Sequence, residues 1–193
     1  VLFGFGRIGR LCARELIKQA GKGQQLRLKG IILRKIDIKS LKKRCALLRQ
    51  DSVHGSFASS ITINEHDLSI VINGQKIQFF DDQTKETLHE HGIHDALLID
   101  NTGVFKDAES LKEHLKLRGV TKVLLTAPGS GIPNIVYGVN QQDINIEEDI
   151  IVSAASCTTN AIAPILKVIS DNNNIQKGHI ETIHAYTNDQ NLL

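Results

Sequence analysis

The sequence lacks any long hydrophobic segment, because no apolar run in its 193 residues approaches the roughly 18 residues that cross a bilayer. It also lacks a strong charge of one sign. The formal net charge is +2, so no overall field favours nucleic acid or a membrane as a partner. No secretory signal precedes the first motif, and a cytoplasmic location is therefore the default expectation.

Cysteine is scarce as well. The three cysteines, Cys12, Cys45 and Cys157, are widely spaced, and no Cys-x-x-Cys pair suggests a zinc site or a redox dithiol. We predict reduced thiols and no metal site. Cys12 and Cys45 fall on apolar faces of expected helices, which is typical of inert core cysteines. With 41% hydrophobic residues, the chain can build one domain and part of another.

A glycine motif opens the chain. The segment Gly4-Phe5-Gly6-Arg7-Ile8-Gly9 fits G-x-G-x-x-G and precedes residues 10–20, which carry apolar residues at helical spacing. Glycines there let the backbone approach a pyrophosphate at the start of a helix, so all six residues are candidate cofactor contacts. The motif also fits a tight turn with no ligand. Because only three residues precede it, we expect the chain to be part of a longer protein.

The expected elements alternate along the chain. Strands are predicted at residues 28–33, 96–100, 122–126 and 150–153, with a helix at 107–117. The pair Asn73-Gly74 is favoured in a type I′ turn and predicts an antiparallel hairpin within residues 61–80. We therefore predict a Rossmann-type α/β fold, a doubly wound parallel sheet with an antiparallel hairpin insertion. A basic run, interpreted as a solvated helix face, consists of Lys39, Lys42, Lys43 and Arg44.

Cys157 lies in Ser156-Cys157-Thr158-Thr159-Asn160, after a predicted strand and before the helical pattern of residues 161–169. A helix N-terminus favours a thiolate over a thiol, so this cysteine is a candidate nucleophile. His184 lies in a strand-like run at residues 180–187, and the sequence alone does not give it a role. The other histidines are explained by solvated surface positions: His54, His66, His89, His91, His94, His114 and His179.

Several motifs together resemble the glyceraldehyde-3-phosphate dehydrogenase family, and they occur in that family's order. They are the glycine motif extended to Arg10, Asp51-Ser52-Val53-His54-Gly55, Asn101-Thr102-Gly103-Val104-Phe105, Thr126-Ala127-Pro128 and Ala155-Ser156-Cys157-Thr158-Thr159-Asn160. The resemblance implies a dinucleotide-binding domain at residues 1–155. It also implies the beginning of an α+β catalytic domain at residues 156–193.

The resemblance implies a cysteine-based oxidation of glyceraldehyde 3-phosphate in glycolysis or gluconeogenesis. Cys157 would attack the aldehyde, and His184, which Thr187 follows at the family's spacing, would be the base. Inorganic phosphate would release the acyl group. Ser156, Thr158 and Thr187 match positions that contact phosphate groups, although Ser156 is equally suited to cap a helix.

The implied cofactor is NAD or NADP. Asn101, Thr102, Gly103 and Thr126 match positions that line the nicotinamide side of the cleft. The family's second strand usually ends in Asn-Asp, where the carboxylate binds the adenosine ribose, whereas this chain has Arg34 and Lys35. These cations would suit the 2′-phosphate of NADP. Alternatively, Asp37 could bind the ribose of NAD, or both cations could simply be solvated.

Two other interpretations stay open. Erythrose-4-phosphate dehydrogenase uses the same thiohemiacetal chemistry, and a non-catalytic nucleotide-binding module would keep the fold without the reaction. The resemblance implies a homotetramer for the full-length protein. It also implies that parts of the substrate site lie outside these residues, so we expect the chain alone to bind nucleotide weakly and to be inactive.

Overall fold

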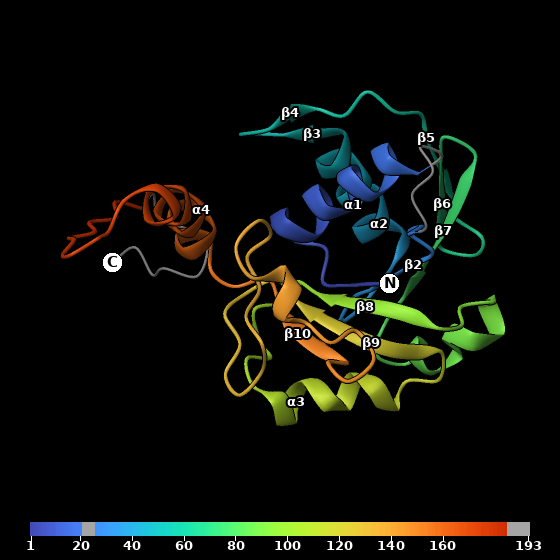
Figure 1. The fold of residues 1–193 in the computed structure, drawn as a ribbon. Helices are drawn as coiled ribbons and strands as arrows, with labels where there is room; N and C mark the ends of the chain where they lie inside the picture. The colour runs from blue at the N-terminus through green and yellow to red at the C-terminus, as the bar shows by residue number, and fades with distance from the viewer. Residues whose placement is uncertain (21–25, 185–193) are drawn as a thin grey trace, which may run out of the picture.

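The computed structural model describes residues 1–20 and 26–184. Within these residues one sheet of eight strands has the order β10-β9-β8-β1-β2-β7-β6-β5 (Figure 1). β1 (Leu2–Phe3) pairs in parallel with β2 (Gly30–Ile32) on one side and with β8 (Ala96–Asp100) on the other. β9 (Val120–Leu125) and β10 (Ile151–Ser153) extend the parallel sheet beyond β8. The predicted Rossmann-type sheet is confirmed.

The order of the strands reverses at β1. The chain passes from β1 to β2 on one side of the sheet and later reaches β8 on the other side. The loops that leave the carboxyl ends of these strands diverge at that point, and open α/β sheets bind their ligands there. The topology therefore predicts a ligand site at the carboxyl ends of β1, β2 and β8.

The antiparallel insertion is also confirmed. β5 (Ile61–Asn64) pairs with β6 (Ser69–Ile72), which pairs with β7 (Gln75–Phe80). Asn73 and Gly74 both have positive φ angles, 49° and 81°, as a type I′ turn requires. β7 then pairs in parallel with β2, so the hairpin widens the same sheet.

Helices cover both faces of the sheet. α1 (Arg7–Gln19) and α2 (Ile38–Arg49) lie on one face, and α3 (Ala108–Lys112) lies on the other, followed by the 3₁₀ helix η2 (Glu113–Lys116) (Figure 1). Each face has its own core of buried side chains. Cys45 is a fully buried residue of α2, and burial raises the pKa of its thiol to about 11. It is a core residue, as predicted.

The remaining elements are short. β3 (Gln50–Asp51) pairs with β4 (Gly55–Ser56) in a two-stranded ribbon, and two 3₁₀ helices, η1 (Lys85–His91) and η3 (Gln141–Asp143), connect longer segments. No helix of residues 1–20 and 26–184 has the length and hydrophobicity of a membrane span.

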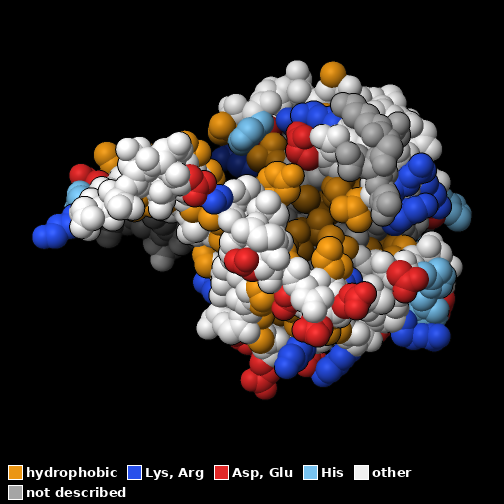
Figure 2. Space-filling view, in the orientation of Figure 1, with side chains coloured by type: hydrophobic (Ala, Val, Ile, Leu, Met, Phe, Trp, Pro, Cys, Tyr) orange, Lys and Arg blue, Asp and Glu red, His pale blue; other side chains and the backbone are white. Residues whose placement is uncertain are grey.

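α4 (Cys157–Asn172) follows β10 and stands apart from the sheet (Figures 1 and 2). It continues through Pro164 and buries none of its residues; Ile165 and Val168 are 55% and 65% exposed. The strand expected at residues 180–187 is not formed by residues 180–184, and the rest lies outside the described residues. A strand needs a neighbour for its backbone hydrogen bonds, and none of the described strands lies beside this segment.

Candidate functional site

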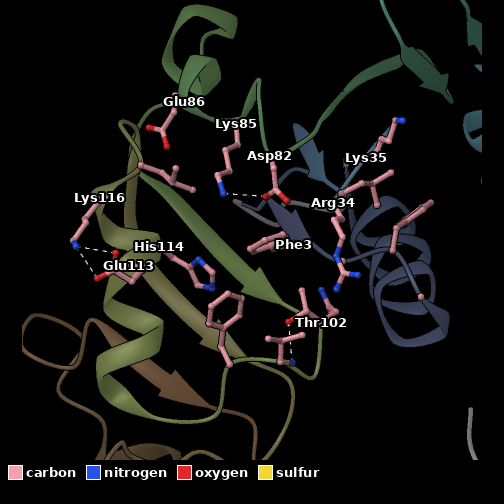
Figure 3. A pocket seen from close by; sticks show the side chains of 18 of the residues that line it. Phe3, Arg34, Lys35, Asp82, Lys85, Glu86, Thr102, Glu113, His114 and Lys116 are labelled. Carbon is pink, nitrogen blue, oxygen red and sulfur yellow. Dashed lines mark hydrogen bonds and ion pairs between the residues drawn. The ribbon is translucent and has the colours of Figure 1, made fainter. Parts of the chain in front are cut away.

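A pocket of about 800 Å³ lies at the carboxyl ends of β1, β2 and β8, where the topology directs a ligand. Figure 3 shows its side chains converging from both halves of the sheet. Seven predicted cofactor residues line it: Gly4, Phe5, Gly6, Arg34, Lys35, Asn101 and Thr102. The other predicted cofactor residues, Arg7, Ile8, Gly9, Gly103 and Thr126, are not in its wall.

The glycine turn brings the end of β1 against the end of β8. Gly4 has a φ of +89°, and a Cβ on it would lie 3.1 Å from the backbone of Asn101 and Thr102. A Cβ on Gly9 would overlap the carbonyl oxygen of Gly4. These two glycines therefore allow the close packing of α1 against the turn.

Gly6 has a different role. It precedes α1, and a Cβ on it would meet no atom within 4 Å, although the residue lines the pocket. No described side chain caps α1 at Gly6, and the first helical bond is the one from Arg10 N to Gly6 O at 3.0 Å. The amides that begin α1 are thus free for an anion such as a pyrophosphate, and the space in front of Gly6 lets it approach.

Beside this turn, the segment 51–55 is tied to α1. Asp51 accepts hydrogen bonds from the amides of Val53 and His54, each at 3.0 Å, and its second oxygen lies 3.6 Å from Arg7 Nε. The hydrogen bonds from His54 and Val53 hold the pKa of the Asp51 carboxyl well below its usual range. Arg7 also donates to Ser52 at 3.0 Å, so its side chain is engaged outside the pocket wall.

His114, which lines the pocket, is hydrogen-bonded to a buried carboxyl group. Asp100 and His114 are 0% and 4% exposed, and His114 Nε2 lies 2.8 Å from Asp100 Oδ2. Asp100 Oδ1 also accepts from the amide and the hydroxyl of Thr102, each at 2.7 Å. The His114 ring packs edge-on against Phe3 and Phe105, which also line the pocket. Asp100 therefore fixes the loop that carries Asn101 and Thr102.

The interpretation of His114 as a solvated surface residue is wrong. Its position one turn after buried Leu111 puts it on the inner face of the segment 108–116. The sequence contained this signal, because Leu111, His114 and Leu115 recur at helical spacing. A histidine at such a position needs a buried partner, and Asp100 is that partner.

The basic run is also only partly solvated. Lys39, Lys42 and Lys43 are exposed, but Arg44 is half-buried and lines the pocket. Arg44 Nη1 donates to the carbonyl oxygen of Phe5 at 3.3 Å. The sequence does not predict this pocket residue, because helical spacing alone does not show which neighbouring loop a side chain reaches.

Cys157 is exposed and is the first residue of α4. The chain turns sharply before it, since Ala155 is buried with a φ of 58°. Ser156 caps the helix, because its Oγ accepts from the Thr159 amide at 2.9 Å. The cap role of Ser156 is confirmed, and its role as a phosphate ligand stays a prediction.

His184 lies near the start of α4, with its Nε2 3.3 Å from Thr158 Oγ1. The structure thus brings His184 to the residue next to Cys157, although 26 residues separate it from Thr158. Neither Cys157 nor His184 lines the pocket that contains Asn101 and Thr102. Because α4 buries no residue, packing does not hold it against the sheet. Thr187 lies outside the described residues.

Comparisons with known proteins agree with this architecture. Residues 1–108 match the family model of the NAD binding domain of glyceraldehyde 3-phosphate dehydrogenase, and residues 156–193 match the C-terminal domain of the same enzyme. The chain is 53% identical over its whole length to a glyceraldehyde-3-phosphate dehydrogenase-like protein of Pseudomonas aeruginosa, 42% of which it covers.

Two further relatives are named glyceraldehyde-3-phosphate dehydrogenase. The protein of Thermotoga maritima is 37% identical and that of Zymomonas mobilis is 36% identical, each over 98% of this chain. The chain covers 54% of each of them. It therefore spans about half the length of the curated relatives that it matches.

Proposed function

The chain belongs to the glyceraldehyde-3-phosphate dehydrogenase family, and on this premise we propose that it supplies the cofactor site and the nucleophile of a phosphorylating aldehyde dehydrogenase. The proposed substrates are glyceraldehyde 3-phosphate and inorganic phosphate, and the proposed cofactor is NAD or NADP. The intact protein is proposed to be a cytoplasmic homotetramer. The observation that carries the proposal is an exposed cysteine that begins a helix directly after a strand of a dinucleotide-type sheet.

The pocket residues suit a dinucleotide. The free amides at the start of α1 and the space beside Gly6 would accept the pyrophosphate. Asn101 and Thr102 would contact the nicotinamide side, and the Asp100 hydrogen bonds to Thr102 hold that loop in place. When bound, the cofactor supplies the acceptor for the two electrons that leave the aldehyde carbon.

The chain's own residues carry the proposed covalent chemistry. The Cys157 thiolate forms a bond to the aldehyde carbon, and the carbonyl oxygen takes up a proton to give a thiohemiacetal. His184 then accepts the hydroxyl proton as the carbon gives up a hydride and becomes a thioester. Phosphate then attacks the thioester carbon, the carbon–sulfur bond breaks, and an acyl phosphate leaves with the thiolate restored. The amide at the start of α4 would stabilise the oxyanion. These steps require α4 to approach the nicotinamide side of the pocket.

The test is reduction of NAD and NADP by the intact protein with glyceraldehyde 3-phosphate, followed by absorbance, with and without inorganic phosphate. The proposal predicts turnover that depends on phosphate and on Cys157. Cys157→Ser should abolish it, whereas Cys12→Ser, which changes a half-buried thiol on α1, should retain it. Phosphate-independent turnover on erythrose 4-phosphate would assign the chain to the alternative substrate. If the protein bound dinucleotide but turned over neither aldehyde, it would be a non-catalytic nucleotide-binding module.

A further inference from the structure

The end of β2 presents cations to the pocket. Leu33 is buried, and the next two residues, Arg34 and Lys35, are exposed and line the pocket. Figure 3 shows both side chains leaving the same strand end, with Arg34 directed toward the loop of Thr102. In Rossmann folds this position faces the adenosine ribose, where an acid binds the 2′-hydroxyl of NAD and an arginine accommodates the 2′-phosphate of NADP.

The acid that could have bound the ribose is engaged elsewhere. Asp37 is the N-cap of α2, and its Oδ1 accepts from the Ser40 amide at 2.6 Å. It is not one of the residues that line the pocket. Asp82, which follows β7 and lines the pocket, is paired with Lys85 at 3.0 Å. Asp37 therefore lies outside the pocket wall, and Asp82 already has a lysine of its own loop as a partner.

Arg44 adds a third cation from α2. Its half-buried side chain extends from α2 to the glycine turn, with Nε donating to Ser40 Oγ at 3.2 Å and Nη1 donating to Phe5 O at 3.3 Å. Burial lowers the pKa of its guanidinium. Among residues 1–20 and 26–184, no carboxylate lies within 4.0 Å of the charged atoms of Arg34, Lys35 or Arg44. These three cations, which all line the pocket, thus have no acidic partner in the part of the chain that the structure describes.

We propose that Arg34, Lys35 and Arg44 form a subsite for the 2′-phosphate of the adenosine ribose, so that this chain selects NADP over NAD. The inference rests on the proposed function, because it deepens the choice of cofactor at the same pocket. A phosphate monoester carries nearly two negative charges and three acceptor oxygens, which matches guanidinium donors from two elements. The hydroxyl of NAD offers neither the charge nor the number of acceptors.

The experiment compares the affinities of the intact protein for NADPH and NADH by nicotinamide fluorescence, and for adenosine 2′,5′-bisphosphate and 5′-AMP by calorimetry. In both pairs the 2′-phosphate should strengthen binding by about 10- to 100-fold, the range for hydrogen bonds to a charged group. Arg34→Ala and Arg44→Gln should each remove much of this difference while changing the affinity for NADH less than about twofold. Arg34→Asp should favour NADH. Lys39→Ala, which removes an exposed cation of α2 outside the pocket wall, is the matched control and should change neither affinity.

If Arg44→Gln weakens the glycine turn, the affinities for NADPH and NADH should fall together, and the exposed Arg34 then provides the test in Arg34→Ala. Equal or tighter binding of NADH by the unaltered protein would overturn the inference and leave the dehydrogenase proposal intact. An equal loss for both dinucleotides in Arg34→Ala would overturn it as well. If folded protein binds neither dinucleotide, the proposed function fails and this inference fails with it.

Discussion

Two alanine substitutions in the glycine motif should separate cofactor binding from folding. A Cβ on Gly9 would overlap the Gly4 carbonyl oxygen and lie 3.1 Å from its carbon. Backbone atoms cannot rotate away, so the cost is expected at the upper end of the roughly 1–3 kcal/mol of overpacking. Alanine regains about 1 kcal/mol of helix propensity. Gly9→Ala should therefore lower the free energy of unfolding by about 2 kcal/mol.

Gly6→Ala should behave in the opposite way. Its φ is −71°, and its new Cβ would meet no described atom within 4 Å, so the free energy of unfolding should fall only by the cost of alanine in place of glycine at an N-cap, about 1 kcal/mol or less. The same methyl group would occupy the space through which a pyrophosphate reaches the amides of α1. Losing one hydrogen bond to a charged group should weaken dinucleotide binding by about 10- to 100-fold.

The assay is urea unfolding without ligand together with dinucleotide binding by fluorescence, for both variants and the unaltered protein. The reasoning would be refuted if Gly6→Ala destabilised the protein as much as Gly9→Ala does. It would also be refuted if Gly6→Ala left dinucleotide affinity unchanged, because the pyrophosphate would then bind elsewhere.

Three further predictions concern stability and thiol reactivity. His114→Leu should cost about 2–3 kcal/mol in urea unfolding, because it leaves the buried Asp100 carboxyl group without one of its hydrogen-bond partners. Lys116→Ala, at an exposed pair with Glu113, should cost less than about 1 kcal/mol. Because the pKa of Asp51 is lower in the folded protein, its ionised carboxylate stabilises the fold above the unfolded pKa of about 3.9, and this stability is lost as the pH falls through the folded pKa. Asp51→Asn should therefore be less stable than the unaltered protein at neutral pH and should lose less stability in acid. Parallel curves for the two proteins in a pH series of thermal unfolding would contradict this. Iodoacetamide at neutral pH should label exposed Cys157 before Cys12 and Cys45, because burial raises the pKa of the Cys12 and Cys45 thiols. If peptide mass spectrometry of the folded protein found Cys45 labelled first, Cys45 would not be a core residue.

The sequence predicted the sheet well because its signals are local. The pattern of residues 96–100 gave β8 with the bounds found in the structure, and Asn73-Gly74 gave the hairpin, since only a turn with two positive φ angles suits that pair. Helix ends moved by a few residues, and α4 begins at Cys157 rather than after it because Ser156 supplies the cap.

Long-range contacts were not predictable in the same way. The Asp100 and His114 pair joins residues 14 positions apart across two elements, and Arg44 reaches Phe5 over 39 positions. Such contacts depend on how α2 and the segment 108–116 pack on the sheet, which hydrophobic spacing does not determine. The cap formed by Asp37, which accepts a hydrogen bond from the Ser40 amide, was not predicted either, although aspartate is a common N-cap residue.

The measurement that tests the central claim most directly is the trapping of the covalent intermediate. The intact protein is incubated with glyceraldehyde 3-phosphate and oxidised dinucleotide in the absence of phosphate, and its peptides are analysed by mass spectrometry. The account predicts an acyl group on the peptide that contains Cys157, and its release when phosphate is added. An acyl group on Cys12 or Cys45 instead, or turnover without any acylated cysteine, would contradict Cys157 as the nucleophile.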